Sequence, residues 1–124
     1  MPTQNSHIVI VDDDAGILEA VKIILEGEGY KVTASSDGEY IETLAKNPKK
    51  PDLILLDVLL SGKDGRELCA MLKKNEVTRH IPIIMFSAHP SASTTVKKAG
   101  ADAFLAKPFN IGDLLSLVEK LLKK

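Results

Sequence analysis

The chain has 124 residues, of which 44% are hydrophobic and 27% are charged, and its formal net charge is −1. These values predict one globular domain over residues 1–124 and exclude an intrinsically disordered chain. The balanced charge offers no general attraction for nucleic acid or for an anionic membrane surface. A single cysteine, Cys69, and the absence of an apolar run of about 20 residues predict a cytoplasmic protein without disulfides or membrane spans.

Short aliphatic runs alternate along the chain with segments of helical periodicity. In the first helix, Ile17, Val21 and Leu25 fall on one face. Gly27 and Gly29 are expected to end that helix. The other helices are expected to begin at residues that can cap free N–H groups, near Asp37, Asp64, Ser91 and Asn110. The predicted strands are residues 8–11, 30–34, 53–56, 81–86 and 103–106.

This alternation predicts a doubly wound α/β fold, because parallel strands need right-handed crossovers that place helices on both faces of the sheet. Four lysine pairs could be taken for a nucleic-acid site. Each pair, however, falls at or just beyond the predicted C-terminal end of a helix, where cations stabilise exposed carbonyl groups. The pairs are residues 49–50, 73–74, 97–98 and 123–124. We expect no nucleic-acid binding by this domain alone.

Polar residues follow the predicted strands at one edge of the sheet, where open α/β sheets carry their binding crevice. Asp12 and Asp13 follow the first strand, and Asp57 follows the third. Ser87 and Lys107 follow the fourth and the fifth. Two carboxylates about 5 Å apart repel by about 3 kcal/mol at an effective dielectric constant near 20. The cluster therefore needs a cation, and Lys107 with Mg²⁺ would supply the equipment of phosphoryl transfer.

Four segments together resemble the receiver domains of two-component response regulators. They are Val11-Asp12-Asp13-Asp14, Leu55-Leu56-Asp57, Ser87-Ala88 and Lys107-Pro108-Phe109. They occur in the family's order and spacing, and the resemblance extends over residues 7–122. It implies a five-stranded parallel sheet, a (βα)5 sandwich, with the flavodoxin-like strand order 2-1-3-4-5.

The resemblance implies that Asp57 accepts a phosphoryl group from a phosphohistidine of a sensor histidine kinase or a phosphotransfer protein. Asp13 and Asp57 would bind Mg²⁺ directly with the main-chain carbonyl of Leu59, and Asp12 would act through metal-bound water. Ser87 would donate a hydrogen bond to the phosphoryl group.

Further roles follow from the same resemblance. Lys107 would contact Asp57 or its phosphate, and the Lys107-Pro108 bond is typically cis in the family. Phe104 matches the aromatic switch position. Ser61 stands where the family usually has proline. The output surface would be the fourth helix, fifth strand and fifth helix, which would bind a downstream protein or form a phosphorylation-dependent dimer of an otherwise monomeric domain.

Two other functions remain open at this point. A Mg²⁺-dependent phosphatase or phosphotransferase with an aspartate nucleophile would share the same carboxylates and lysine. A pseudo-receiver that only binds proteins would not need them. Because the chain ends one helix after Lys107, we expect either a single-domain regulator or a module of a longer protein, which promotes only its own phosphorylation and dephosphorylation.

The last two helices give expectations about packing. The fourth helix, residues 91–96, has few large apolar residues and should be held loosely. In the fifth helix, one apolar stripe is expected to pack on the sheet, and a second stripe is expected either to remain partly exposed or to belong to the core as well. The first stripe is Ile111, Leu115, Val118 and Leu122, and the second is Leu114, Leu117 and Leu121. Cys69 is expected to be a packed thiol.

Overall fold

The computed structural model describes residues 6–60, 62–89 and 91–122. Its main sheet has five parallel strands in the order β2-β1-β3-β6-β7. These strands are β1 (His7–Val11), β2 (Lys31–Ser35), β3 (Leu53–Asp57), β6 (Ile83–Ser87) and β7 (Ala103–Ala106). Since β6 and β7 are the fourth and fifth strands of this sheet, the predicted order 2-1-3-4-5 is confirmed.

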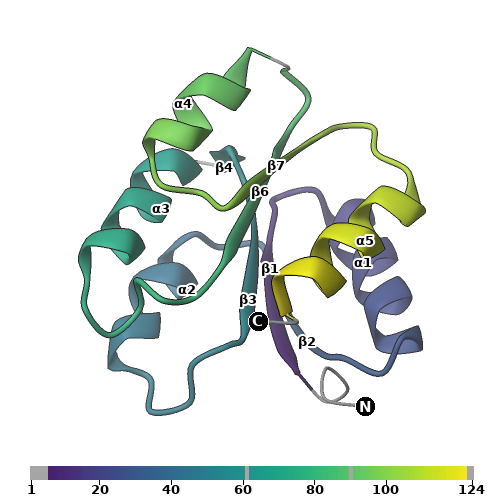
Figure 1. Ribbon diagram of the computed structural model, residues 1–124, viewed down its shortest axis with the longest axis horizontal. Helices are drawn as coiled ribbons and strands as arrows, with labels where there is room; N and C mark the ends of the chain where they lie inside the picture. Colours follow the sequence, from purple (N-terminus) through teal and green to yellow (C-terminus); the bar gives the residue numbers. More distant parts are fainter. Residues whose placement is uncertain (1–5, 61, 90, 123–124) are drawn as a thin grey trace.

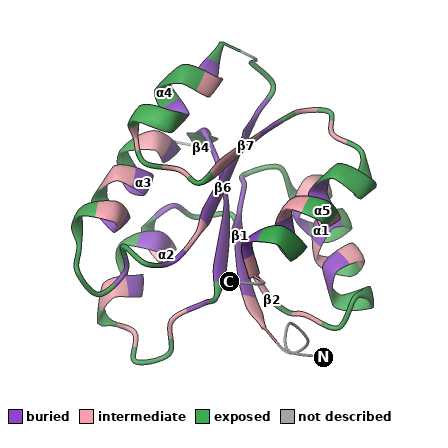
Figure 2. Cartoon of the chain, in the orientation of Figure 1, coloured by how far each residue is buried: buried purple, intermediate pink, exposed green. Residues whose placement is uncertain are grey.

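Helices cover both faces of the sheet (Figure 1). One face carries α1 (Ala15–Gly27) and α5 (Ile111–Leu122), and the other carries α2 (Glu39–Glu42), α3 (Gly65–Lys74) and α4 (Ala92–Lys98). Figure 2 shows that the buried positions follow the central strands and the inward sides of the helices. The doubly wound α/β fold predicted from the sequence is confirmed.

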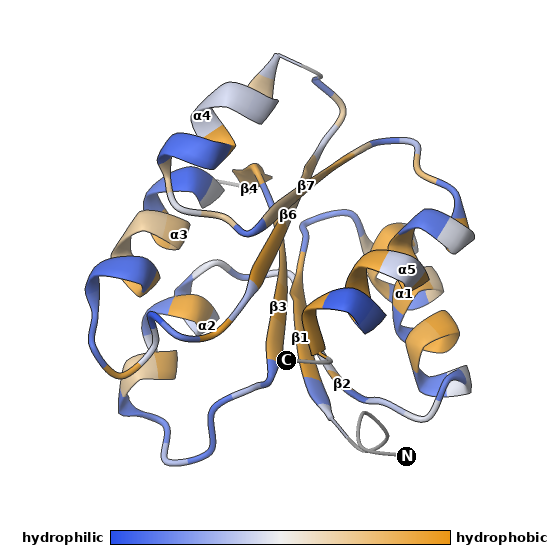
Figure 3. Ribbon diagram, viewed as in Figure 1, coloured by the Kyte–Doolittle hydropathy of each residue, from blue (hydrophilic) through white to orange (hydrophobic). Residues whose placement is uncertain are grey.

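The sheet separates two hydrophobic cores. Side chains of a strand point alternately to its two faces, so neighbours in β1 and β3 enter different cores. Val9 and Ile54 lie in the core beneath α2, α3 and α4, whereas Ile8 and Leu55 lie in the core beneath α1 and α5. The central strands are apolar over most of their length, as Figure 3 shows, because both of their faces are covered. A rigid central sheet therefore holds the residues at its carboxyl edge.

Several helix boundaries follow from local chemistry. Asp14 caps α1, with its side chain accepting hydrogen bonds from the amides of Gly16 and Ile17. Asp64 caps α3, whereas Ser91 makes no side-chain cap bond at α4. The lysine pairs of α3 and α4 lie in the last turns, as expected, and the pair at 123–124 lies outside the described residues.

The second helix is much shorter than predicted. It has a single turn at Glu39–Glu42, followed by a 3₁₀ turn at Leu44–Lys46. Thr43 separates the two turns, and its hydroxyl donates to the Tyr40 carbonyl. Buried Ile41 and Leu44 anchor the segment, so tertiary burial holds it without a regular helix.

A short antiparallel hairpin follows the third strand and was not predicted. It consists of β4 (Leu59–Leu60) and β5 (Lys63–Asp64), and Gly62 has a φ of 73° in its turn. Glycine adopts this left-handed conformation without the steric cost of a side chain. Ser61, the predicted departure from the family pattern, lies outside the described residues.

Of the two alternatives for the fifth helix, the partly exposed second stripe is wrong, because members of both stripes pack against the core beneath α1 and α5. The residues of α5 that are buried are Leu114, Val118 and Leu121, and Ile111 is 52% exposed. The apolar arc of this helix is wider than one stripe, so its period alone does not choose which edge faces the sheet. Asn110, whose side chain accepts the Asp113 amide, starts the helix and helps to set its rotation.

The packing of Cys69 and of α4 was also predicted from the sequence. Cys69 is fully buried, which confirms the packed thiol, and burial raises its pKa to about 11. In α4, Ala92 and Val96 are the buried residues. Within the described residues, no helix is long and apolar enough to cross a membrane.

Candidate functional site

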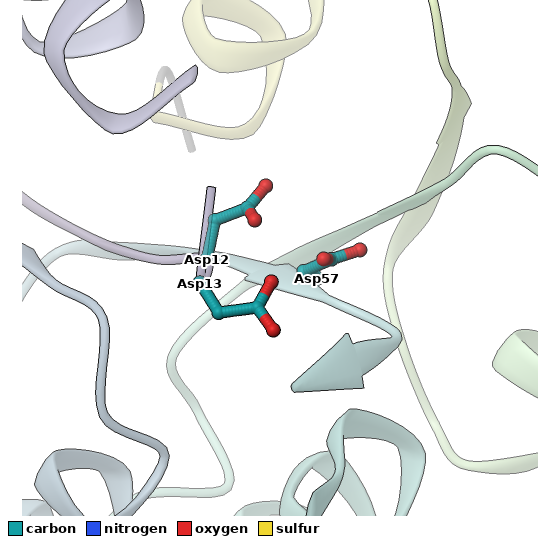
Figure 4. A group of neighbouring side chains, drawn as sticks. All are labelled: Asp12, Asp13 and Asp57. Carbon is teal, nitrogen blue, oxygen red and sulfur yellow. The ribbon is translucent and has the colours of Figure 1, made fainter. Parts of the chain in front are cut away.

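Three carboxylates meet at the carboxyl edge of the sheet, as predicted. Asp12 and Asp13 directly follow β1, and Asp57 is the last residue of β3. The two strands are paired, with Val11 opposite Leu56, so the residues after them are neighbours. One carboxylate oxygen from each of the three aspartates lies within 4.8 Å of the others. Figure 4 shows the three side chains converging.

The three carboxylates differ in exposure. Asp12 is 0% and Asp57 is 7% exposed, whereas Asp13 faces solvent. Asp12 Oδ1 accepts the amide of Asp14 at 2.9 Å, which holds the loop after β1 in place. A group of hard oxygen ligands that is open on one side can hold a metal ion with bound water, and these donors fit Mg²⁺ or a similar divalent cation.

Lys107 supplies the ammonium at this site. Its Nζ donates a hydrogen bond to Asp12 Oδ2 at 2.8 Å and lies 3.4 Å from Asp57 Oδ2. Nζ also lies 4.9 Å from the centroid of the Phe86 ring. Burial lowers the pKa of Lys107, but the hydrogen bond and attraction to Asp12, with attraction to Asp57, outweigh it and raise the pKa overall. Lys107 therefore stays charged, and its shortest contact is to Asp12.

The Asp57 carboxyl group has a raised pKa. Burial and the neighbouring Asp12 carboxylate raise its pKa from 3.8 to about 6, and Lys107 only partly opposes this rise. Burial disfavours the charged form of a carboxyl group, and a like charge adds to that effect. One ammonium does not balance three carboxylates, so the site favours an additional cation.

Ser87 lies at the same edge, on the other side of Asp57. It is 3% exposed and ends β6, which pairs with β3. Its Oγ accepts the amide of His89 at 3.0 Å. Phe104 lies in β7 and is half-buried against the core beneath α2, α3 and α4. The structure thus brings Ser87 to the carboxylates and places Phe104 in the strand next to β6.

Leu59 lies in β4, two residues after Asp57, with its side chain 55% exposed. It pairs with Asp64 across the hairpin. The Lys107-Pro108 bond is cis, as the resemblance implied.

Gly65 is a site residue that sequence reasoning missed. Its amide donates to the Val58 carbonyl at 2.7 Å. A Cβ atom at this position would lie 2.0 Å from the Asp57 carbonyl oxygen, closer than any non-bonded contact permits. The first residue of α3 must therefore be glycine for α3 to approach the strand that carries Asp57. The glycine directly after the capping Asp64 was the available signal, but the sequence predicted only the start of a helix there.

Comparisons with known proteins agree with this geometry. The model of the response regulator receiver domain family matches residues 8–119. The DNA-binding dual master transcriptional regulator RpaA of Synechocystis sp. is 38% identical over 120 residues, covering 95% of this chain and 49% of that protein. The phosphate regulon transcriptional regulatory protein PhoB of Pseudomonas aeruginosa is 36% identical, covering 94% of this chain and 52% of that protein. The chain spans about half the length of these curated relatives.

Solved structures give the same result. The receiver domain of a signal transduction histidine kinase from Syntrophus aciditrophicus has a TM-score of 0.85 and 35% identity, covering 95% of this chain and 90% of that one. A CheY-like receiver domain protein from Methanospirillum hungatei has a TM-score of 0.85 and 33% identity, covering 95% and 94%. The chain therefore belongs to the response regulator receiver domain family, whose members are phosphorylation-controlled switches of two-component signalling.

Proposed function

We propose that this chain accepts a phosphoryl group on Asp57 and changes its partner-binding surface in response. The observation that carries the proposal is the convergence of Asp57 with two further carboxylates and Lys107 at the end of the central strand. An Asp57 carboxylate oxygen would attack the phosphorus of a phosphohistidine. The P–N bond to the imidazole would break as the O–P bond forms, and the donor histidine would leave.

Each neighbouring group has a role in this transfer. Lys107, held charged between two carboxylates, would bind a phosphoryl oxygen, since an ammonium stabilises the charge spread over the transferred group. The Ser87 hydroxyl would turn from its present bond with the His89 amide to donate to another oxygen. Phe104 would then move inward in β7, as the aromatic switch of the family does.

The metal in this proposal is Mg²⁺. Asp13 and Asp57 would bind it directly with the main-chain carbonyl of Leu59, and Asp12 would act through metal-bound water. The solvent-facing position of Asp13 and the burial of Asp12 are consistent with these different roles. When bound, Mg²⁺ supplies positive charge that offsets the negative charge of the incoming phosphoryl group and of the carboxylates.

The partners follow from the same proposal. A sensor histidine kinase or a phosphotransfer protein would supply the phosphoryl group, and α4, β7 and α5 would bind a downstream protein or a second copy of the domain. Residues 1–124 would form one receiver domain in the cytoplasm, either alone or as part of a longer regulator. It would promote only its own phosphorylation and dephosphorylation.

The acceptor can be identified by mass. Incubation with Mg²⁺ and a small phosphodonor such as acetyl phosphate should add one phosphoryl group to the parent protein and none to Asp57→Asn. The adduct should survive acid and be lost in base, as an acyl phosphate is. Asp14→Asn is the matched control, because Asp14 caps α1, and it should label like the parent. Labelling of Asp57→Asn at the parent rate would show that another residue is the acceptor. Repeated turnover of phosphate esters would instead favour a phosphatase or phosphotransferase.

Metal binding at the three carboxylates has a separate test. Asp13→Ala should weaken Mg²⁺ binding at least tenfold, by roughly 1.4 kcal/mol or more, because a solvent-facing ligand is lost. The affinity for Mg²⁺ is measured by titrating the ion and following the NMR signal intensities or chemical shifts of residues near Asp57. No phosphodonor is needed. Asp37→Ala, on the exposed loop after β2, is the control and should bind Mg²⁺ like the parent. Equal affinities for Asp13→Ala and the parent would place the metal elsewhere.

A further inference from the structure

Arg66 links α3 to α4 beside the candidate site. Its Nη1 donates to Thr95 Oγ1 of α4 at 3.0 Å. Its other donors hold Asp64, with Nε 2.9 Å from Oδ1 and Nη2 2.7 Å from Oδ2. The guanidinium group is planar and rigid, so this two-point attachment fixes the direction of the third donor. Arg66 is therefore positioned to hold Thr95.

Arg66 is attached to the start of α3 and to the hairpin beside Asp57. Asp64 also caps α3 by accepting the Arg66 amide at 2.9 Å, and it pairs with Leu59 across the hairpin. The next residue, Gly65, is packed against the Asp57 carbonyl. The guanidinium group is thus tied to the same backbone that carries Asp57.

Thr95 lies in α4, a helix with few buried side chains. The seven residues of α4 bury Ala92 and Val96, and the outer side of the helix is exposed (Figure 2). Ser87, at the end of β6, precedes this helix in the chain, and its Oγ accepts the His89 amide. The Ser87 hydroxyl therefore holds the backbone three residues before the first residue of α4.

A cavity of about 290 Å³ borders this link. Its lining includes Leu59, Arg66, Ser87 and Thr95, so it borders both the hairpin and α4. The first turn of α4 can therefore shift into open space without displacing atoms of the packed core.

We propose that Arg66 and Thr95 form a latch that holds α4 in its unphosphorylated position and opens when Asp57 is phosphorylated. The proposal rests on the proposed function, in which the Ser87 hydroxyl turns to the phosphoryl group. That turn releases the His89 amide, and the first turn of α4 shifts with it. Arg66 does not follow, because Asp64 holds it at two points. The hydrogen bond to Thr95 is then lost.

This latch opposes the change that phosphorylation produces. A bond present in one state and absent in the other biases the equilibrium toward the state that contains it. Removing the latch should therefore make modification at Asp57 more favourable by the same factor by which it loosens α4. The fold-change in the hydrogen exchange of α4 and the fold-change in affinity for a phosphoryl mimic should then be equal.

The first measurement uses the unmodified protein. Thr95→Val removes the hydroxyl group and keeps the branched shape, and it should speed amide hydrogen exchange over residues 96–99 by about fivefold. Thr94→Val is the matched control, since Thr94 is the adjacent, also exposed threonine of α4, and its exchange should equal the parent's. Because the Thr95 hydroxyl also donates to the Ala92 carbonyl, Arg66→Met provides the second variant. The double variant should exchange no faster than the faster single variant, since both remove one link.

The second measurement uses beryllofluoride with Mg²⁺ as the phosphoryl mimic. Thr95→Val should bind the mimic about fivefold more tightly than Thr94→Val, and the difference in exchange between the two variants should shrink once it is bound. Equal exchange of both variants in the unmodified protein would overturn the latch. A difference that persists undiminished with the mimic bound would show that the link does not open. Failure of the parent to bind the mimic would count against the proposed function, whereas exchange in the unmodified protein would still test the link.

Discussion

Gly65→Ala should destabilise the domain by about 3 kcal/mol and displace Asp57. Overpacking of a well-packed site costs about 1–3 kcal/mol, and here the added atom would collide with the backbone. The added Cβ would lie 2.0 Å from the Asp57 carbonyl oxygen and 3.1 Å from Met85 Cε. The methionine end can move, but the strand carbonyl cannot move without disturbing β3. Urea unfolding followed by circular dichroism measures the loss as a lower midpoint with an unchanged slope.

The matched control for this substitution is Gly27→Ala. Gly27 is the last residue of α1 and is exposed, and a Cβ added there would meet no neighbouring atom within 4 Å. Alanine favours a helix over glycine by about 0.5–1 kcal/mol, so this variant should be as stable as the parent or slightly more stable. If Gly65→Ala unfolds at the parent's midpoint, the close approach of α3 to Asp57 is not required.

Lys107→Met should destabilise the metal-free domain by about 3 kcal/mol at about pH 8, because loss of one partner leaves buried charges uncompensated. Lys107 is 16% exposed in its side chain and contacts Asp12, which is 0% exposed. The long methionine side chain keeps the packing against Phe86, so the change isolates the charge. The free energy of unfolding from urea titration is the measurement.

The pH dependence of this deficit has a definite sign. The folded-state pKa of Asp57 is raised from 3.8 to about 6, so the protonated carboxyl is favoured in the fold. Its contribution to stability is complete below the unfolded pKa of 3.8 and is lost as pH rises through about 6. Without Lys107 the ionised form is still less favourable, so the deficit of Lys107→Met should be largest above pH 6 and shrink as acid protonates Asp57.

Two further variants decide whether charge is the cause. Adding Asp12→Asn to Lys107→Met should recover much of the stability, since the amide oxygen still accepts the Asp14 amide and the buried charge is gone. Lys63→Met removes a lysine whose ion pair with Glu42 is exposed, and exposed pairs contribute little, so its midpoint should match the parent's. A deficit of Lys107→Met that is independent of pH and not relieved by Asp12→Asn would indicate lost packing instead.

The sequence alone determined the succession of strands and helices along the chain. It also determined which residues lie at the edge of the sheet. Aliphatic runs such as residues 8–11 are buried on both faces, and that pattern is local in the chain. Parallel pairing alone brings to one edge the residues that lie at or just after the carboxyl end of a strand, which are Asp12, Asp57, Ser87 and Lys107. Their meeting could therefore be predicted before any distance was known.

Only the tertiary structure decided how these groups and elements are oriented. The apolar arc of α5 is consistent with two buried stripes, and the packing on the sheet selected Leu114, Val118 and Leu121. Lys107 lies nearer to Asp12 than to Asp57, although both carboxylates are buried. Gly65 approaches Asp57, and Arg66 reaches Thr95, 29 positions along the chain. Such contacts depend on how separate elements dock, and no local pattern of residue types encodes them.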